Sequence, residues 1–333
     1  MNSNSANVIE DLTKLPQKPL VTIRCSTYNH QQFITDAIEG FLMQKTDFPL
    51  EILIHDDAST DGTAEIVRKY QAQHPKLIRA VYQSVNQFSQ GKRPRELLNT
   101  LSRGKYIALC EGDDYWIDPL KLQKQVDFLE SHPECSLCCH KVVFHYENGL
   151  KADHQYPGYN QDRIFSKKEY YQHYITVTCS TLFKNYTSDE LLRYLQDFKV
   201  GDTPLFYYLI QKGKFAYLPD CMAVYRIHSN SIWSSKSENY QLLTNIDTFE
   251  KIKDKLGIKS SHLPLFYNNY RLTGNYFSEN NYQGMRKHII KCYKYWRDGK
   301  RDQLIRVIGF TIFAYFPFIG KLFKKLRKSE VIG

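Results

Sequence analysis

The chain has 333 residues, which is long enough for one large α/β domain with an appendage. It carries 45 Lys and Arg against 35 Asp and Glu, and the excess lies in residues 286–333, which hold 13 basic and 3 acidic residues. A basic chain can bind nucleic acid, but this one contains no recognisable nucleic-acid-binding module, so we expect no nucleic-acid partner.

The first part of the chain alternates apolar runs with helical spacing. Residues 20–25 (LVTIRC) predict a strand that leads into the polar segment 26–30, and residues 51–54 (EILI) predict a second strand that leads into HDDASTDGT. Each is followed by a helical pattern, and the second helix has Ser59, Thr60 or Asp61 available as N-cap. This βαβα order predicts a doubly wound, mostly parallel α/β sheet with polar loops at corresponding strand ends.

A third apolar run, residues 106–109, is followed at once by a cluster of acids, Glu111, Asp113 and Asp114. Ligands of open α/β sheets bind outside the carboxyl ends of the strands, which is where these side chains are expected. Hard oxygen ligands at this spacing suit Mg²⁺ or Mn²⁺ holding a diphosphate. The alternative is an acidic pair on a solvated loop.

Five segments occur in an order and at a spacing that resemble a known family. They are VTIRCSTYNHQQFITDAIEGFLMQ, EILIHDDASTDGT, GKYIALCEGDDYW, VGDTPLF and YRIHSNS, and together they cover roughly Pro19 to Trp233. They are similar to the inverting family 2 glycosyltransferases of GT-A fold, which use nucleotide-diphosphate sugars. The resemblance implies a Rossmann-like GT-A domain over residues 19–235, a nucleotide-sugar donor and a glycan or lipid-linked acceptor.

The resemblance also implies which residues contact the nucleotide sugar. Thr27 and Tyr28 match the first nucleotide-binding loop, while Asp56 and Asp57 match the acidic pair that contacts base and ribose. Capping of the following helix is the other role open to these two acids. Gly104 and Lys105 match a loop before the third strand, and Glu111 lies at the first acid of the Asp-x-Asp motif. Arg226 matches a residue that clamps the diphosphate.

The metal and the catalytic base follow from the same resemblance. Asp113 falls on the second acid of the motif, Asp114 is a second candidate, and His228 matches a C-terminal histidine that binds metal or diphosphate. Asp202 matches the acid that removes the proton of the acceptor hydroxyl as this attacks the anomeric carbon. Its alternative role is N-capping of the helix expected over residues 204–211.

Two further segments have both a functional and a structural interpretation. Tyr115 and Trp116 follow the acids directly, so they are candidates for sugar or acceptor contacts, and they suit an apolar core almost as well. The basic segment 86–95 is expected to be a loop. Lys92, Arg93 or Arg95 would reach phosphate from it, or the segment is simply solvated.

Cysteine spacing around Cys135, Cys138, Cys139 and His140 superficially matches a zinc site. No second pair follows at finger distance, and the segment SLCCHKVVF is typical of a buried strand, in which thiols behave as small hydrophobic groups. Residues 1–18 form a polar, acid-bearing tail without the features of a secretory signal, which favours a reducing, cytoplasmic compartment with free thiols.

The C-terminal part is expected to be a helical extension over residues 236–300 and a tail over residues 301–333. Helical spacing over residues 265–295, interrupted near 278–281, resembles one tetratricopeptide hairpin. The apolar run Val307–Phe323 has basic residues on both sides, and its uncharged part is shorter than the roughly twenty residues of a bilayer span. We expect it to lie on an anionic membrane surface, or else to dock on the catalytic domain as a terminal helix.

These features predict a metal-dependent inverting glycosyltransferase, dependent on Mn²⁺ or Mg²⁺, at the inner face of the plasma membrane. Two alternatives remain. A nucleotidyltransferase has a glycine-rich, basic first loop, which is missing here because the first strand leads into STYNHQQ. An inactive nucleotide-sugar-binding module would have lost the acids, whereas Asp113, Asp202 and His228 are all present.

Overall fold

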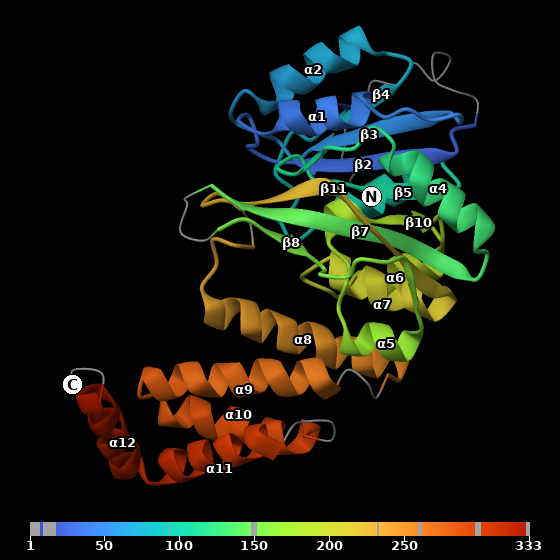
Figure 1. Cartoon of the computed structure of the whole chain (residues 1–333). Coiled ribbons are helices and arrows are strands. Elements are labelled where there is room, and N and C mark those ends of the chain that lie inside the picture. Colours follow the sequence, from blue (N-terminus) through green and yellow to red (C-terminus); the bar gives the residue numbers. More distant parts are fainter. Residues whose placement is uncertain are drawn as a thin grey trace. The chain divides into compact units, whose positions relative to one another are not determined.

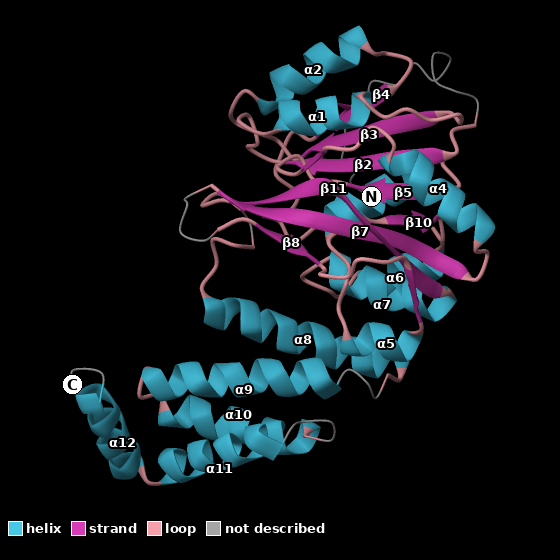
Figure 2. Ribbon diagram, in the orientation of Figure 1, coloured by secondary structure: helices cyan, strands magenta, loops and turns pink. Residues whose placement is uncertain are grey.

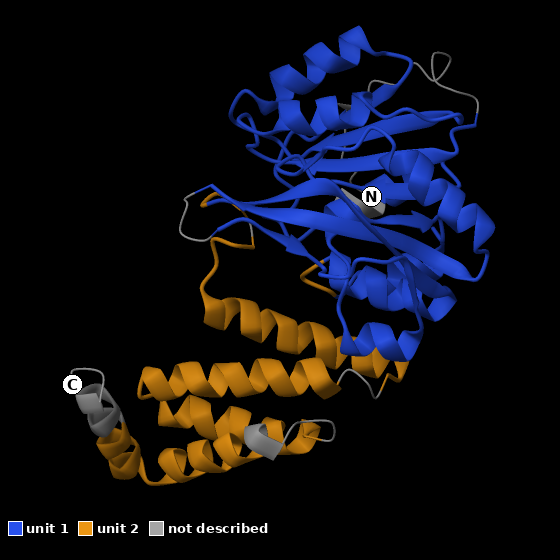
Figure 3. Ribbon diagram, viewed as in Figure 1, with its two compact units in different colours: residues 1–197, 201–228 blue, residues 198–200, 229–333 orange. Residues whose placement is uncertain are grey.

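The computed structural model describes residues 7–8, 18–92, 94–147, 152–231, 233–258, 262–296 and 301–330. These residues form two compact units, one of residues 1–197 and 201–228 and the other of residues 198–200 and 229–333 (Figure 3). The first unit holds the sheet, and the second is helical (Figure 2). Most of the expected N-terminal tail lies outside the described residues.

The N-terminal half of the first unit is a parallel sheet in the order β4-β3-β2-β5 (Figure 1). Its strands are β2 (Val21–Thr27), β3 (Leu50–Asp56), β4 (Ile78–Tyr82) and β5 (Tyr106–Leu109), joined by α1 (Ile34–Leu42), α2 (Thr63–Gln73) and α3 (Pro94–Leu101). Alternate residues of β3 pack in opposite directions, with Ile52 and Ile54 in the main core and Leu53 against Leu98 of α3. Burial on both faces explains why apolar residues point to both sides of these strands, and the polar side chains among them, such as Thr22, Glu51 and Arg79, are buried as well.

The other half of the sheet is mixed. β10 (Leu182–Lys184) runs antiparallel to both β5 and β7 (Cys135–Tyr146), and β7 pairs in parallel with β11 (Lys214–Ile227). Short antiparallel strands complete it: β6 (Tyr115–Trp116) and β9 (Arg163–Phe165) on β11, β8 (His154–Tyr156) on β7, and β1 (Asn7–Val8) on β4. The remaining helices are α4 (Lys121–Ser131), α5 (Lys167–Gln172), α6 (Asp189–Leu195) and α7 (Asp202–Lys212). The α/β class with a mostly parallel central sheet is therefore confirmed.

Several local predictions are sharpened by the structure. β2 and β3 continue through Thr27 and Asp56, two residues later than the apolar pattern indicated, so both residues end strands and pair in register. The buried strand expected around Cys138 is confirmed as β7, in which Cys135, Cys138, Cys139 and His140 are buried. One long strand, β11, follows α7, and its pairing with β7 has register irregularities between Leu218 and Ala223.

The second unit contains α8 (Glu238–Leu256), α9 (His262–Ser278), α10 (Tyr282–Tyr295), α11 (Arg301–Tyr315) and α12 (Pro317–Glu330). The helical hairpin with a break near residues 278–281 is confirmed as α9 and α10, whose core includes Leu272 and Ile289. Val307 and Ala314 of α11 join the same core. The tail therefore packs through one face on the helical extension.

Within the described residues no single helix is both long and apolar enough to cross a membrane. Residues 304–315 and 317–323 pass this test only as a pair, and the two helices are bent by 119° at the break between them.

A buried ionic cluster holds β3 against the strand and loop beside it. Glu51 is fully buried, and its Oε1 accepts hydrogen bonds from Thr22 Oγ1 at 2.7 Å and from the Arg103 backbone N–H at 3.0 Å. Its Oε2 accepts from Arg103 Nε at 2.8 Å and lies 3.4 Å from Arg79. A carboxylate this deep is tolerated only because two guanidinium groups and a hydroxyl surround it.

We predict that Glu51→Ala lowers the free energy of unfolding by about 3 kcal/mol, because it removes the buried carboxylate that pairs with the buried Arg79 and with Arg103. Urea unfolding followed by circular dichroism measures this change. Glu65→Ala is the matched control, since Glu65 meets Arg68 at 3.7 Å on the surface and both side chains are more than half exposed. Equal unfolding midpoints for the two variants would show that the buried cluster does not stabilise the sheet.

Candidate active site

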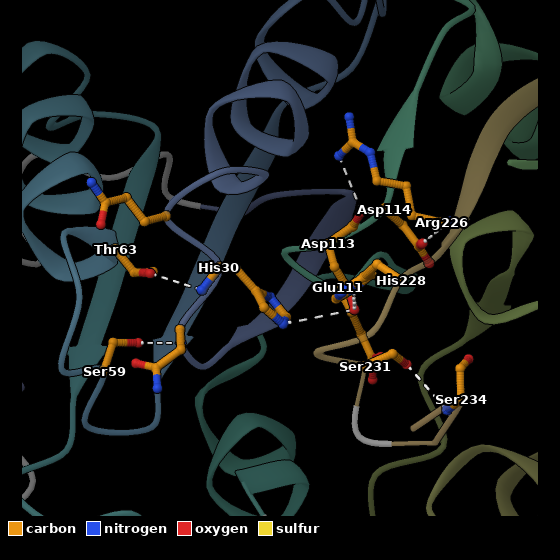
Figure 4. Close-up of polar contacts among 12 residues, drawn as sticks. His30, Ser59, Thr63, Glu111, Asp113, Asp114, Arg226, His228, Ser231 and Ser234 are labelled. Carbon is orange, nitrogen blue, oxygen red and sulfur yellow. Dashed lines mark hydrogen bonds and ion pairs between the residues drawn. The ribbon is translucent and has the colours of Figure 1, made fainter. Parts of the chain in front are cut away.

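The polar loops that follow β2, β3 and β5 meet at the carboxyl edge of the parallel strands (Figure 4). Thr27 and Asp56 end neighbouring strands, and the turn after β5 is tied to β2 by a hydrogen bond from the Gly112 N–H to the Ser26 carbonyl at 2.9 Å. Gly112 is required there, because a Cβ would lie 2.7 Å from Thr27 Oγ1 and 2.9 Å from Thr27 Cβ. This close approach brings the acids of residues 111–114 beside β2.

Asp113 is the centre of this site because one of its oxygens faces two imidazoles (Figure 4). Its Oδ2 lies 3.2 Å from His228 Nε2, at hydrogen-bond distance, and 3.7 Å from His30 Nε2. Burial acts to raise the pKa of Asp113, but the hydrogen bond with His228 and the charge of the neighbouring imidazoles outweigh it and lower the pKa below its usual value. The carboxylate is thus held as an anion.

His30 was not assigned a role from the sequence, although it lies in the polar segment after β2. Asn29, in a left-handed conformation with φ of 55°, turns the chain before it, and the His30 N–H donates to Thr63 Oγ1 at 2.9 Å. Its carbonyl accepts from the N–H of Ile34 at 2.8 Å, at the start of α1. The signal that sequence reasoning overlooked is its place at the same strand end as Thr27.

Glu111 and Asp202 complete the acidic cluster. The loss of water around its carboxylate is the largest effect that raises the pKa of Glu111 to about 8, and the negative charges of Asp113 and Asp202 add to it. The Glu111 side chain itself is exposed to solvent. Asp202 is the first residue of α7, and its Oδ1 accepts from the Thr203 N–H at 2.7 Å, while Gly201 is the N-cap residue. The structure therefore brings Asp202, Asp113 and Glu111 together.

Asp114 and Arg226 link the acidic turn to β11. Asp114 is only 2 % exposed, and its Oδ1 accepts from the Arg226 backbone N–H at 2.9 Å. The Arg226 guanidinium donates to the Asp113 carbonyl at 3.1 Å, pairs with Asp36 and stacks 4.3 Å from the centre of the Tyr115 ring. Through these contacts both side chains join β11 to the acidic turn. The roles of Asp114 toward a metal and of Arg226 toward a diphosphate stay predictions.

The paired acids after β3 also differ from each other. Both oxygens of Asp57 accept backbone hydrogen bonds, from Gln87 at 2.8 Å and Phe88 at 3.0 Å, so Asp57 holds the following loop. Neither acid caps α2, because the N–H of Thr63, the first residue of the helix, donates a hydrogen bond to Asp61 Oδ1 at 3.0 Å. Asp56 Oδ1 and Thr27 Oγ1 are buried and have no hydrogen-bond partner among the described residues.

Unpaired buried oxygens of this kind cost free energy unless a ligand or water satisfies them. Thr27 and Asp56 therefore remain good candidates for nucleotide contacts. Tyr28, next to Thr27, is half-buried.

Gly104 and Lys105 lie at the opposite edge of the sheet, because they precede β5. The Gly104 N–H donates to Thr22 Oγ1 at 2.8 Å at the start of β2, and Lys105 pairs with Glu130 at 2.6 Å. Their assignment to the nucleotide sugar is therefore wrong.

Trp116 takes the structural role that the sequence left open. It is 2 % exposed, its Nε1 donates to the Cys179 carbonyl at 2.9 Å, and its ring packs on Phe41. In the basic loop, Lys92 is exposed, while Arg93 and the Arg95 side chain lie outside the described part of the chain.

The chemistry of the site fits a divalent cation. Asp113 and Glu111 offer hard oxygen donors, and the negative charges that crowd Glu111 are the arrangement that a cation relieves. The Nδ1 atoms of His30 and His228 are buried without a hydrogen-bond partner among the described residues. In the same residues no group of three or more acidic, His or Cys side chains is already spaced as a metal site. The structure thus supplies donors without a preformed coordination sphere.

Comparison with known proteins identifies the class. The sequence model of the family described as "Glycosyl transferase family 2" matches residues 22–190, which is half of the chain. The chain therefore belongs to glycosyl transferase family 2.

Two relatives and one solved structure illustrate the likeness. An uncharacterized protein of Mycobacterium tuberculosis is 38 % identical over 213 residues, which are 63 % of this chain and 59 % of that protein, so the chain spans only about three-fifths of this relative. The glucosyltransferase WfaP of Escherichia coli is 27 % identical over 265 residues, 77 % of this chain and 94 % of WfaP. The mannosyltransferase PcManGT of Pyrobaculum calidifontis has a TM-score of 0.52 at 17 % identity, with 95 % of this chain and 86 % of that chain covered, which shows the same fold.

Proposed function

We propose that the protein is a metal-dependent, inverting glycosyltransferase that transfers a sugar from a nucleoside-diphosphate sugar to an acceptor hydroxyl in polysaccharide or lipid-linked glycan synthesis. The observation that carries this proposal is the convergence of Asp113, Glu111, His228 and Asp202 at the carboxyl edge of the sheet in a family 2 chain. WfaP is named as a UDP-Glc:alpha-D-GlcNAc-diphosphoundecaprenol beta-1,3-glucosyltransferase, and PcManGT was solved with GDP-Man and Mn²⁺. Both names support a nucleotide-sugar donor.

The donor is proposed to lie across the ends of β2, β3 and β5. The unpaired oxygens of Thr27 and Asp56 would accept hydrogen bonds from the nucleoside, which would lie beside Tyr28. Asp113 and Glu111 would hold Mn²⁺ or Mg²⁺. His228 would either orient the Asp113 carboxylate or bind the cation as a further ligand. When bound, the cation supplies positive charge to the departing nucleoside diphosphate.

Asp202 is proposed to act as the catalytic base. Its carboxylate accepts the proton of the acceptor hydroxyl while the hydroxyl oxygen forms a bond to the anomeric carbon. The bond from that carbon to the diphosphate breaks on the opposite side, and the configuration inverts. The hydrogen bond from the Thr203 N–H holds one carboxylate oxygen at the start of α7, and the charge of Asp202 acts on Glu111 in the cluster.

The second alternative, an inactive nucleotide-sugar-binding module, makes the same contacts without transfer. The transferase and the binding module differ in the role of Asp202, because only the transferase needs a catalytic base at this position.

The proposal extends to a membrane surface through the tail. Several large apolar side chains of α11, of α12 and of Phe316 between them are exposed: Ile305, Ile308, Ile312, Tyr315, Phe316, Phe318, Leu322 and Phe323. The surrounding segment is the basic part of the sequence. Apolar insertion together with attraction to anionic lipid supports a peripheral position at the inner face of the plasma membrane.

We predict that Asp113→Asn weakens Mn²⁺-dependent binding of UDP or GDP at least tenfold, because it removes an anionic ligand with little change of shape. Isothermal titration calorimetry with and without Mn²⁺ measures this. Asp220→Asn is the control, since Asp220 is half exposed beside Lys124 and has no place in the cluster. Unchanged metal-dependent affinity in Asp113→Asn would refute the metal assignment.

Asp202→Asn is expected to keep nucleoside-diphosphate affinity and to reduce transfer by about a hundredfold or more, as loss of a general base requires. Sugar transfer is followed by release of the nucleoside diphosphate. Asp189→Asn is a matched control, because Asp189 is likewise the first residue of a helix, α6. If folded Asp202→Asn turns over like the wild type, the acid serves only the helix terminus.

The tail prediction uses the full chain, because Val307 and Ala314 contribute to the helical core. The triple variant Ile308→Gln, Ile312→Gln and Phe318→Gln should lose flotation with phosphatidylglycerol vesicles, while the wild type floats at low salt and less strongly at high salt. Tyr240→Gln with Leu243→Gln, at exposed apolar positions of α8, is the control. Wild-type protein that stays off the vesicles at low salt would exclude membrane association.

A further inference from the structure

A strip of aromatic rings crosses three adjacent strands of the first unit. We name it the aromatic strip and define it as Tyr225 of β11, Phe144 and Tyr146 of β7, and His154 and Tyr156 of β8. The Phe144 ring lies 5.1 Å from Tyr225 and 5.8 Å from Tyr156, and it stacks on His154 at 5.2 Å with an angle of 8° between the planes. His154 in turn stacks on Tyr146 at 5.9 Å.

Strand register places these rings on one face of the sheet. Phe144 pairs directly with His154 in β8 and with Tyr225 in β11, and Val142 pairs with Tyr156. Side chains of directly paired residues lie on the same face, and every second residue along a strand returns to it. His145 and Gln155 therefore lie on the opposite face.

The strip remains accessible although its inner edge packs on the core. Phe144, Tyr156 and Tyr225 contact the main hydrophobic cluster but are only partly buried. Tyr146 is also partly buried, and His154 is exposed. Packing of the hydrophobic core alone does not require partly exposed aromatic rings on three adjacent strands.

One end of the strip reaches the acidic cluster. Burial raises the pKa of Tyr225, and the charges of four acids raise it further: Asp114, Glu111, Asp113 and Asp202. Tyr156 donates a hydrogen bond from its hydroxyl to the Tyr174 carbonyl, and the Tyr174 hydroxyl lies 3.5 Å from Thr203 Oγ1, next to Asp202. The strip thus begins near the acidic cluster and crosses from β11 over β7 to β8.

We propose that the aromatic strip binds the acceptor, by stacking the pyranose rings of a neutral glycan on Tyr225, Phe144, Tyr156, His154 and Tyr146. This inference rests on the proposed glycosyltransferase function. The apolar C–H face of a pyranose packs on an aromatic ring, and successive sugars of a chain match rings that follow one another across the sheet. None of the five side chains of the strip is a Lys or Arg that would pair with an acidic sugar. The strip therefore selects a neutral carbohydrate chain over an acidic one.

The test uses the double variant Tyr146→Ala with His154→Ala, which removes the two stacked rings farthest along the strip from the acids. The control is His145→Ala with Gln155→Ala, the neighbouring positions on the opposite face of the same two strands. Binding to immobilised cellobiose, chitobiose and a glucuronic-acid-containing disaccharide is measured with UDP or GDP and Mn²⁺ present. Nucleoside-diphosphate affinity is measured in parallel by calorimetry.

We expect the wild type and the control to bind the neutral disaccharides more tightly than the acidic one, and the strip variant to lose about tenfold in that affinity. Nucleoside-diphosphate affinity should be equal in all three proteins. If wild type binds nucleotide but no neutral disaccharide, or if strip variant and control bind sugar equally, the acceptor assignment is wrong. A protein that binds sugar through the strip but binds no nucleotide would overturn the proposed transferase function and leave the strip as a carbohydrate site.

Discussion

The site depends on one carboxylate shared by two imidazoles. Asp113 lies in the turn after β5, His30 follows β2, and His228 follows β11, so contacts at a single oxygen join three segments that are far apart in the sequence. Phe33 lies against the His228 ring, with centroids 4.6 Å apart, and limits how that ring can turn. Arg226 adds a second link from β11 to the same turn through its backbone and guanidinium.

This convergence explains why the remaining acids have different roles. Neighbouring residues in a tight turn point in different directions, so Asp113 faces the imidazoles while Asp114 is buried on β11. The same holds after β3, where Asp57 fixes the following loop and Asp56 keeps one unpaired oxygen. Each pair divides into one acid that maintains the architecture and one that is suited to a ligand. Burial without a partner is costly, and it is retained where function requires it.

Much of the fold was predictable because the apolar periodicity of the parallel strands is strong, and their order followed from alternation with helices. Placing Asp113, Asp202 and His228 together was predictable from the family resemblance. Gly104 and Lys105 were assigned from their position in the family pattern alone, although a loop before the third strand lies at the amino ends of the parallel strands, away from the expected ligand. The roles of Asp57 and Arg226 depend on long-range hydrogen bonds, and the aromatic strip depends on the pairing of β7 with β8 and β11, none of which a local pattern encodes.

The central claim is that the Asp113 cluster holds the cation that accompanies a nucleoside diphosphate. The most direct measurement is anomalous X-ray scattering from a crystal of the protein grown with Mn²⁺ and UDP or GDP. The account predicts a manganese peak within bonding distance of an Asp113 carboxylate oxygen, with the diphosphate against the same peak and the nucleoside toward Thr27 and Asp56. A nucleotide bound with manganese away from Asp113, or without any manganese peak, would contradict it.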